Sequence, residues 1–486
     1  MISLRPYQQT GVENIRGRFG AGDRAVLYVL STGGGKTFTF SYIAASAANL
    51  GNRVLILVHR TELLQQSSLS LAAIGVEHGL IAPAKKAKAI AGEHFDTLGR
   101  SYIDQQATVF VASVQTIARQ LDKWAHLFKL VIIDEAHHAT AGQWARTIEA
   151  CSNARVLGVT ATPVRTDGQG LGREAGGVFD SLVEGPSITE LIKLGYLVRP
   201  QVFAPPAQFD LKGIRKTAGG DYNQKQLAER MDTPTITGDA VAHYQRYLGG
   251  KSAIAFCASI AHAEHTAEAM RQAGVRAAAV SGKTPDEERR RMIADLGAGK
   301  LDVLSSCDIV SEGTDIPSVT GALLLRPTQS EGLFLQQVGR VLRPAEGKDR
   351  AIILDHVGNC LTHGLPDEER PWTLDGREKN ERGPRDEEPD INVQQCPTCY
   401  SVHAPAPSCP ACGHVYTPEE RQIKQVDGEL AEVTEAQRET LRQRRRLEVG
   451  KARTQDEFER IAAERGYSAG WVHKMMEIRR NQRRAA

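Results

Sequence analysis

Ser31-Thr32-Gly33-Gly34-Gly35-Lys36-Thr37 is the stretch that decides the fold of this chain. It follows residues 25–30, an apolar run rich in strand-forming side chains, and precedes residues 38–50, an alanine-rich segment without proline. A strand, a glycine-rich loop and a helix in this order are typical of a phosphate-binding loop. The glycines let backbone N–H groups curl around a polyphosphate, and the helix directs its positive dipole end at the same anion.

Two side chains at the end of this loop have defined roles in such a site. Lys36 is predicted to bring a positive charge to the β- and γ-phosphates of ATP, and Thr37 a hydroxyl to Mg²⁺. The predicted nucleotide site also includes Thr32, Gly33, Gly34 and Gly35. One departure from the common pattern is Leu30, which stands where the pattern begins with glycine.

The composition describes an ordinary globular protein with an uneven distribution of charge. The chain has 486 residues, 41% of them hydrophobic, and a net charge of only +2, so the totals give no nucleic-acid signal. Residues 441–486, however, hold 13 Lys and Arg against 6 Asp and Glu. No apolar run approaches the ~20 residues that cross a bilayer. The N-terminus lacks the layout of a signal peptide, so we expect a cytosolic protein without a membrane partner.

Strand-like segments alternate with helix-like ones along the first 190 residues. Apolar runs at residues 53–58, 108–112, 130–133 and 155–159 each end in polar residues. Continuous apolar strands separated by helices predict an α/β fold with a parallel, doubly wound sheet. The polar residues that follow the strands lie at the carboxyl edge, where such sheets bind ligands.

The strand at residues 130–133 leads directly into Asp134-Glu135-Ala136-His137. Asp134 is predicted to be the second Mg²⁺ anchor, and Glu135 to orient and deprotonate the attacking water. His137 can couple this site to neighbouring loops. Upstream of the phosphate loop, Gln8 lies on a predicted helix that runs to about Phe19, and its amide could read an adenine edge.

Together these motifs resemble those of the superfamily 2 helicases of the DEAD/DEAH-box type. The resemblance is carried by STGGGKT, by DEAH, by Thr160-Ala-Thr162-Pro and by the opening Arg5-Pro-Tyr-Gln8. It implies that Arg5 and Gln8 bind ATP and that His137, Thr160 and Thr162 couple the nucleotide to the rest of the motor. It also implies a second domain that faces the nucleotide.

The second half of the chain contains the motifs expected of that domain. Arg340 and Arg343 are three residues apart, so a helix would place both guanidinium groups on one face, as arginine fingers for a γ-phosphate. The set Gln336, Gly339, Arg340 and Arg343 matches motif six of the family. Gly313, Thr314 and Asp315 match motif five, which contacts nucleotide and nucleic acid.

The resemblance implies two RecA-like domains in tandem, residues 1–190 and residues 191–365, with ATP bound between them. The family's nucleic-acid contacts map, less specifically, onto Arg60, Ser113, Gln115, Thr116, Ser259, Gly282 and Thr314. Residues 366–392 are dense in charge and proline and predict a solvated linker.

The tail carries two cysteine pairs, Cys396–Cys399 and Cys409–Cys412, each with two intervening residues. This spacing predicts a tetrahedral Zn²⁺ module over residues 393–416. Residues 417–486 predict a basic helical tail, in which arginine clusters near Tyr467 and Trp471 could grip a nucleic-acid strand. A solvated helix pair is an equal alternative. Within the superfamily, a four-cysteine module after this core is similar to RadD-type DNA-repair helicases and phage helicases.

Three functions are compatible with these residues. The first is a DNA-dependent ATPase that translocates on or remodels single-stranded or branched DNA, with ATP, Mg²⁺ and Zn²⁺ as ligands. The second is an RNA helicase or remodelling factor. The third is a nucleotide-gated scaffold whose zinc module or tail recruits a protein partner, and the intact Glu135, Arg340 and Arg343 argue against it.

Overall fold

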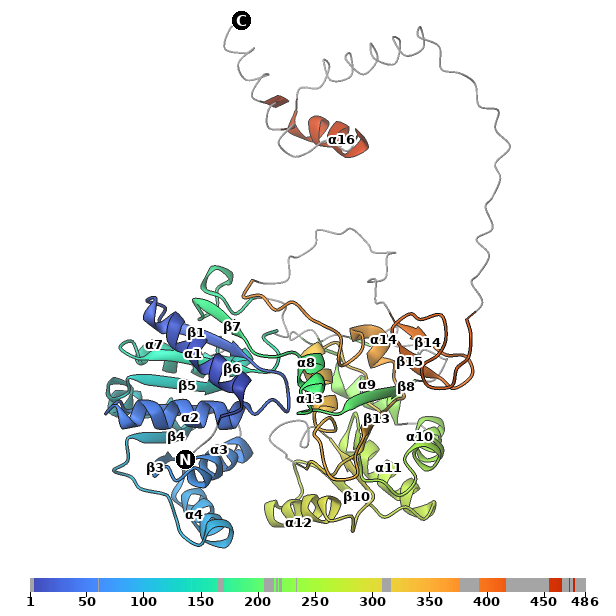
Figure 1. Cartoon of the computed structure of the whole chain (residues 1–486), viewed down its shortest axis with the longest axis horizontal. Coiled ribbons are helices and arrows are strands. Elements are labelled where there is room, and N and C mark those ends of the chain that lie inside the picture. The colour runs from blue at the N-terminus through green and yellow to red at the C-terminus, as the bar shows by residue number, and fades with distance from the viewer. Residues whose placement is uncertain are drawn as a thin grey trace, which may run out of the picture. The chain divides into compact units, whose positions relative to one another are not determined.

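The computed structural model describes residues 4–59, 61–140, 142–164, 170–204, 214–215, 217, 221–232, 234–307, 316–375, 393–416, 454–465, 472 and 475–476. The chain divides into two units, Met1–Tyr416 and Thr417–Ala486. Figure 1 shows that the first unit is built around two sheets, each with helices packed on it. None of the described helices is long and apolar enough to cross a membrane.

The first sheet, with its helices, forms domain 1. Its strand order is β3-β4-β2-β5-β6-β1-β7, and every pair is parallel. The strands are β1 (Ala25–Val29), β2 (Val54–Val58), β3 (His78–Ile81), β4 (Val109–Ser113), β5 (Leu130–Asp134), β6 (Arg155–Thr160) and β7 (Ser181–Glu184). The predicted parallel, doubly wound sheet is therefore confirmed.

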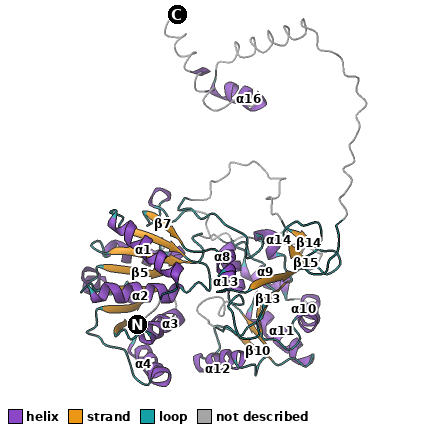
Figure 2. Cartoon of the chain, in the orientation of Figure 1, coloured by secondary structure: helices purple, strands orange, loops and turns teal. Residues whose placement is uncertain are grey.

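Helices cover both faces of this sheet (Figure 2). They are α1 (Pro6–Gly20), α2 (Lys36–Asn49), α3 (Thr61–Ala73), α4 (Ala84–Leu98), α5 (Val114–Ile117), α6 (Leu121–Trp124) and α7 (Gly142–Ala150), with short 3₁₀ turns at Ala125–Leu127, Ala136–His138 and Arg173–Ala175. Successive β1 residues enter opposite cores: Val26 and Tyr28 pack with α1 to α3, and Leu27 and Val29 with α5 and α7. The strict alternation explains why every residue of β1 is apolar.

The second sheet forms domain 2 and has the order β10-β11-β9-β12-β13-β8-β15-β14. Its parallel strands are β8 (Arg199–Phe203), β9 (Ala253–Phe256), β10 (Ala277–Val280), β11 (Val303–Ser306), β12 (Gly321–Leu324) and β13 (Arg350–Asp355). Its helices are α8 (Ile188–Lys193), α9 (Gln224–Met231), α10 (Pro234–Tyr247), α11 (Ile260–Gln272), α12 (Asp286–Gly297), α13 (Glu331–Gly339) and α14 (Asn359–His363).

The four-cysteine module is attached to this second sheet. Its strands β14 (Gln394–Gln395) and β15 (Ser401–His403) extend the sheet, and β15 pairs antiparallel with β8. Val402 is buried in the core of domain 2, and the backbone N–H of Ala204 donates to the carbonyl of Tyr400 at 3.1 Å. The module therefore covers the edge of β8, which would otherwise expose unpaired backbone groups.

The prediction of a solvated linker over residues 366–392 is wrong for residues 366–375, and the rest lies outside the described residues. Trp372 packs against the cores of both domains, and Leu374 against that of domain 1. Arg370 forms a mostly buried ion pair with Glu331. Charge density alone is a poor guide here: Glu368 and Glu369 are exposed, whereas Arg370 is paired and Trp372 packs inward.

The second unit is described only in part. Its helix α16 (Gln455–Arg465) buries Phe458, Ile461 and Ala462, which pack with Val472. The arginine clusters and the aromatic residues Tyr467 and Trp471 of the predicted basic tail lie outside the described residues.

A buried histidine pair is expected to make domain 1 sensitive to acid. The Ser68 hydroxyl lies 2.7 Å from His78 Nε2 and 3.1 Å from His94 Nε2, and both rings are fully buried. Burial lowers the pKa of His78 to about 4 and also lowers the pKa of His94. Both folded-state pKa values lie below the unfolded value, so the stabilisation is complete above about pH 6.5 and is lost as the pH falls toward 4.

We expect the free energy of unfolding to fall on acidification, with His78 contributing up to about 3 kcal/mol. Urea unfolding between pH 8 and pH 4.5 measures this loss. His78→Gln should be less stable than the wild type at pH 8 and lose less stability on acidification. The matched change at exposed His126 should keep the wild-type acid sensitivity. An unchanged pH dependence in His78→Gln would contradict the assignment.

Candidate nucleotide and nucleic-acid sites

The phosphate-binding loop joins β1 to α2 and needs glycine at two positions. Gly33 and Gly35 both have φ of 84°, in the left-handed region that other residues rarely adopt. A Cβ at Gly35 would lie 2.5 Å from Gln8 Nε2, and one at Gly33 would lie 2.7 Å from Leu197 Cδ2. The glycines thus allow both the curl of the loop and its close packing against α1 and domain 2.

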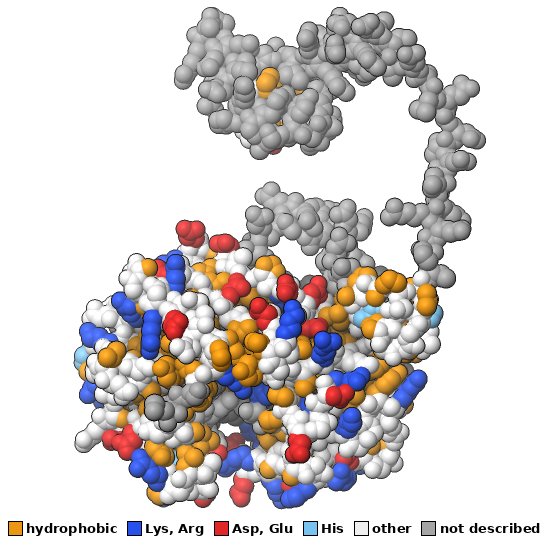
Figure 3. Space-filling model, viewed as in Figure 1, with side chains coloured by type: hydrophobic (Ala, Val, Ile, Leu, Met, Phe, Trp, Pro, Cys, Tyr) orange, Lys and Arg blue, Asp and Glu red, His pale blue; other side chains and the backbone are white. Residues whose placement is uncertain are grey.

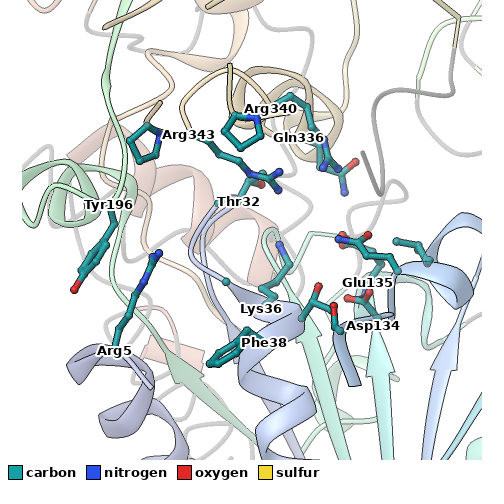
Figure 4. A pocket seen from close by; sticks show the side chains of 18 residues that line it. Arg5, Thr32, Lys36, Phe38, Asp134, Glu135, Tyr196, Gln336, Arg340 and Arg343 are labelled. Atoms are coloured by element: carbon teal, nitrogen blue, oxygen red, sulfur yellow. The ribbon is translucent and has the colours of Figure 1, made fainter. Parts of the chain in front are cut away.

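A cleft of about 400 Å³ opens beside this loop and is lined by both domains. Its lining residues from domain 1 and the segment after α8 are Arg5, Thr32, Gly33, Gly35, Lys36, Thr37, Phe38, Leu63, Gln66, Ser70, Asp134, Glu135 and Tyr196; domain 2 adds Pro317, Gln336, Arg340, Arg343 and Pro344. Figure 4 shows Arg340 and Arg343 on the side opposite Lys36, Asp134 and Glu135. The structure therefore brings together residues separated by some 300 positions in the sequence, as their motifs predicted.

Cationic side chains outnumber carboxylates among the described residues that line this cleft. Burial lowers the pKa of Lys36; Glu135 and Asp134 oppose that shift, whereas Arg340 and Arg343 reinforce it. Burial also lowers the pKa of Arg343 to about 10, which leaves its guanidinium protonated at neutral pH. The buried Thr32 hydroxyl has no hydrogen-bond partner among the described residues. The lining includes four cationic side chains, those of Arg5, Lys36, Arg340 and Arg343, and two carboxylates. With the orphaned hydroxyl of Thr32, this set fits a polyphosphate held with a divalent metal ion.

Glu135 is held in a strained backbone conformation, with φ of 51°. Its backbone N–H donates to Asp134 Oδ1 at 3.0 Å, and its Oε2 lies 3.5 Å from His137 Nδ1. That buried Oε2 has no hydrogen-bond partner among the described residues. The carboxylate is thus placed at the cleft with an oxygen still able to accept a hydrogen bond, as a water-orienting residue requires.

The three predicted coupling residues form a continuous chain of contacts from Glu135. His137 Nδ1 lies 3.3 Å from Thr160 Oγ1, and the Thr160 hydroxyl donates to the carbonyl of Thr162 at 3.1 Å. Burial is the main cause of the lowered pKa of His137. A Cβ on Gly332 of α13 would lie 3.0 Å from Thr162 Oγ1, so this chain reaches domain 2. The contacts are compatible with coupling, which stays a prediction.

The arginines do not share a helix, contrary to the sequence prediction. Helix α13 ends at Gly339, Arg340 is its C-cap, and Arg343 lies in the irregular segment before Pro344. The residue before a proline is disfavoured in helical conformation, which explains the early end. Both guanidinium groups nevertheless line the cleft. The end of α13 can approach the phosphate loop this closely because residue 339 is glycine: a Cβ there would lie 2.4 Å from Thr32 Cγ2.

The opening motif supports the phosphate loop and an aromatic patch. Gln8 is buried; its Nε2 lies 3.4 Å from the carbonyl oxygens of Gly34 and Gly35, and its Oε1 accepts from the Arg5 N–H. The Arg5 guanidinium lies 4.2 Å from the centre of the Tyr196 ring. Tyr196 and Phe38 line the cleft but were missed by the sequence analysis, since no motif or periodicity marks them.

The predicted nucleic-acid contacts are only partly described. Arg60, Gly313, Thr314 and Asp315 lie outside the described residues. Ser113 and Ser259 cap helices: their hydroxyls accept from the N–H groups of Thr116 at 3.3 Å and His262 at 3.0 Å. Gln115 donates to the carbonyl of His59 at 3.2 Å, and Gly282 is an exposed residue after β10. Ser113 ends β4 and the others follow strands, so all lie at or beyond carboxyl ends, as predicted. Their role in nucleic-acid binding stays a prediction.

The four cysteine sulfurs of the module lie within 4.8 Å of one another. The Sγ–Sγ distances are 3.6 Å for Cys396 and Cys412 and 3.7 Å for Cys399 and Cys409. A tetrahedral zinc with bonds of about 2.3 Å separates its sulfurs by about 3.8 Å. The cluster therefore fits one Zn²⁺ ion, as the spacing predicted.

Zinc removal tests this cluster. Cys396→Ser with Cys399→Ser should release one zinc per chain and expose the edge of β8, because a module this small depends on the metal for its folding. Elemental analysis gives the stoichiometry, and amide exchange of β8 reports its edge. Cys257→Ala, a buried thiol outside the cluster, should keep the zinc. Full-length protein that contains no zinc when purified without chelator would contradict the assignment.

Two protein families match parts of this chain. Residues 1–165 match the family "Type III restriction enzyme, res subunit", and residues 239–345 match "Helicase conserved C-terminal domain". A 51.5 kDa protein of a Lactococcus phage is 31% identical over 397 residues, covering 81% of this chain and 78% of its own. IRC3 of Saccharomyces cerevisiae, named as an ATP-dependent helicase, is 30% identical over 73% of this chain, which spans about half (51%) of IRC3.

A solved structure shares the fold. The type ISP restriction-modification enzyme LlaBIII, solved bound to DNA, superposes with a TM-score of 0.51 over 74% of this chain and 28% of that chain, at 19% identity. At this identity the likeness concerns the arrangement of the two sheets and not the chemistry.

Proposed function

This chain belongs to the superfamily 2 helicases, and from that premise we propose that it hydrolyses ATP in the cleft between its two sheets to translocate along or remodel DNA. The observation that supports the site most strongly is the convergence of Lys36, Asp134 and Glu135 with Arg340 and Arg343 across one cleft. Phosphoryl transfer depends mainly on positioning and electrostatic stabilisation, and these five side chains can supply both.

Each residue of the cleft has a separate task in this proposal. Lys36 and the backbone N–H groups of residues 32–37 hold the phosphates, and Thr37 and Asp134 hold the metal ion. Bound Mg²⁺ would neutralise charge on the phosphate oxygens. Glu135 orients the attacking water and accepts its proton through Oε2, which makes no hydrogen bond among the described residues. Arg340 and Arg343 stabilise the charge that develops on the transferred phosphoryl group.

The base of the nucleotide has a separate candidate site. Arg5 and Tyr196 stack on each other, and Tyr7 joins them, with its ring centre 5.3 Å from that of Tyr196. The Tyr7 hydroxyl donates to the carbonyl of Gly34 at 2.8 Å. We assign purine stacking to the Arg5–Tyr196 face. Gln8 is buried against the phosphate loop and is not among the residues that line the cleft, so binding of the base edge by its amide stays a prediction.

Support for DNA as the substrate comes from the relatives. One matched family is named for restriction enzymes, and the solved structure with the same fold was bound to DNA. An RNA substrate is the alternative, because none of the described contacts distinguishes a deoxyribose from a ribose.

Figure 3 shows acidic and basic side chains mixed over the visible face of the first unit, with Lys and Arg around the hollow between its halves.

A narrower role follows from the resemblance to RadD-type and phage helicases. We assign the enzyme to DNA repair, recombination or phage DNA metabolism, with the zinc module or the basic tail binding DNA or a protein partner. The module covers the edge of domain 2 rather than the nucleotide cleft, which fits recruitment better than catalysis.

A single assay tests the proposal. ATP turnover is measured with single-stranded DNA, duplex DNA, forked DNA and RNA side by side, with Lys36→Ala as the inactive control. We expect stimulation by DNA, greatest with single-stranded or forked DNA. Stimulation by RNA alone would favour the RNA helicase, and no turnover with any nucleic acid would favour the nucleotide-gated scaffold.

A further inference from the structure

A second segment crosses between the two domains in addition to the chain that joins β7 to α8. Residues 364–375, called the strap here, follow α14 of domain 2 and, in Figure 1, run in orange toward β7 of domain 1. The backbone N–H of Gly172 donates to the carbonyl of Leu374 at 2.9 Å, and Leu374 packs against the core of domain 1. The far end of the strap is therefore fixed to domain 1.

Arg370 fixes the middle of the strap to domain 2. Its Nε donates to Glu331 Oε1 at 2.6 Å, and its terminal nitrogens donate to the carbonyls of Glu368 at 2.7 Å, His363 at 2.9 Å and Leu365 at 3.0 Å. The side chains of Arg370 and Glu331 are only 11% and 15% exposed. Removing either side chain would deprive a mostly buried charge of this ion-pair partner, which is unfavourable.

Glu331 is the first residue of α13, the helix that ends beside the phosphate loop. Gln336 lines the cleft from this helix, and Arg340 from its C-cap. A helix of this length is rigid, so the position of its first turn determines where its last turn lies. The close approaches of Gly332 to Thr162 and of Gly339 to Thr32 leave little room for a shift.

We propose that Arg370 is a positioning residue for ATP hydrolysis: through Glu331 the strap holds α13 so that Arg340 and Arg343 face Lys36. The inference rests on the proposed function, because it assigns no separate reaction to the strap. The anchor at Leu374 extends the effect to domain 1. Trp372, which packs against the cores of both domains, lies between the two anchors.

Four substitutions test the strap without touching the cleft. Arg370→Met and Glu331→Gln break the ion pair, and Arg370→Lys keeps the charge but has a single donor nitrogen. Gly172→Ala acts from domain 1: its Cβ would lie 2.9 Å from Leu374 Cβ, whereas its φ of −75° is open to alanine. Gly92→Ala is the control, because a Cβ there meets nothing within 4 Å.

We expect Arg370→Met, Glu331→Gln and Gly172→Ala to lower kcat by about 10- to 100-fold, since a displacement of about 1 Å costs roughly that much in rate. The KM for ATP and the affinity for a fluorescent ATP analogue should stay within about threefold, and Arg370→Lys should recover part of kcat. The double variant Arg370→Met with Glu331→Gln should be no worse than either single change, because both remove one interaction.

A structural readout separates this inference from the proposed function. Amide exchange of α13 should rise in Arg370→Met and Gly172→Ala but not in Gly92→Ala. If the wild type has no ATPase activity but the variants still show these exchange changes, the proposed function is refuted and the inference that the strap positions α13 stands. Wild-type kcat and wild-type exchange in the strap variants would overturn the inference. So would a parallel fall in kcat, nucleotide affinity and melting temperature, which would indicate a merely structural contact.

Discussion

Glu135→Gln is expected to abolish ATP turnover while the protein still binds ATP. Glutamine has nearly the same shape as glutamate but cannot accept the proton of the attacking water, and a positioned general base is worth about 10²- to 10⁴-fold in rate. The carboxylate is buried beside Asp134, the proposed metal ligand, and its Oε2 makes no hydrogen bond among the described residues. Loss of hydrolysis without loss of binding should trap a state bound to nucleic acid.

Single-turnover hydrolysis and the affinity for a fluorescent ATP analogue measure the two effects separately. Lys36→Ala should differ by weakening binding itself, because the phosphates lose their buried cation. Glu149→Gln makes the same chemical change on the exposed face of α7 and should leave both quantities unchanged. Turnover by Glu135→Gln at the wild-type rate would show that the water-positioning role belongs to another residue.

The predicted strands that proved correct lie mainly at the centres of the sheets. Strands β1, β2, β5 and β6 are apolar at nearly every position because both faces are covered, so composition alone identifies them. No strand was predicted for β3 or β7, which lie at the two edges of the first sheet. Edge strands are short and contain polar residues, and their pairing depends on neighbours far away in sequence.

The residues of the proposed nucleotide site were largely predictable because their motifs are local in the sequence. Lys36 directly follows the glycine-rich loop, and Asp134 and Glu135 directly follow the apolar residues of β5. Neighbouring residues in the sequence are therefore enough to predict where these three side chains lie. Tyr196 could not be predicted in the same way, since it reaches the cleft only through the packing of the segment after α8. The helical argument for Arg340 and Arg343 was wrong, although both residues do line the cleft.

The remaining errors of prediction concern contacts between segments that are far apart in the sequence. The cysteine spacing specified a set of zinc ligands but not the edge of β8 that the module covers, because strand pairing across some 200 residues leaves no local signal. The charged composition of residues 366–375 predicted solvation, whereas Arg370 is paired and Trp372 is packed. A truncation near residue 366 therefore removes the strap, so a cut after residue 416 is the cleaner test of the tail.

Arg343→Ala is expected to lower ATP turnover by about 10³-fold or more while weakening ATP binding much less. Burial lowers the pKa of this guanidinium to about 10, so it stays charged at neutral pH in a desolvated position. Its attraction to phosphate oxygens is strong there, and it grows as charge develops in the transition state. Ground-state binding still has Lys36, the backbone of the loop and Arg340.

The comparison of two replacements identifies how Arg343 acts. Arg343→Lys keeps the charge but loses the planar fork of donors, so turnover should recover only in part. Arg16→Ala, an exposed arginine on α1, controls for the loss of a positive charge. The ratio of kcat to ATP affinity is the decisive quantity: an equal loss in both would mean that Arg343 binds ATP and its transition state alike. A selective loss in kcat would place the guanidinium on the phosphoryl group during transfer.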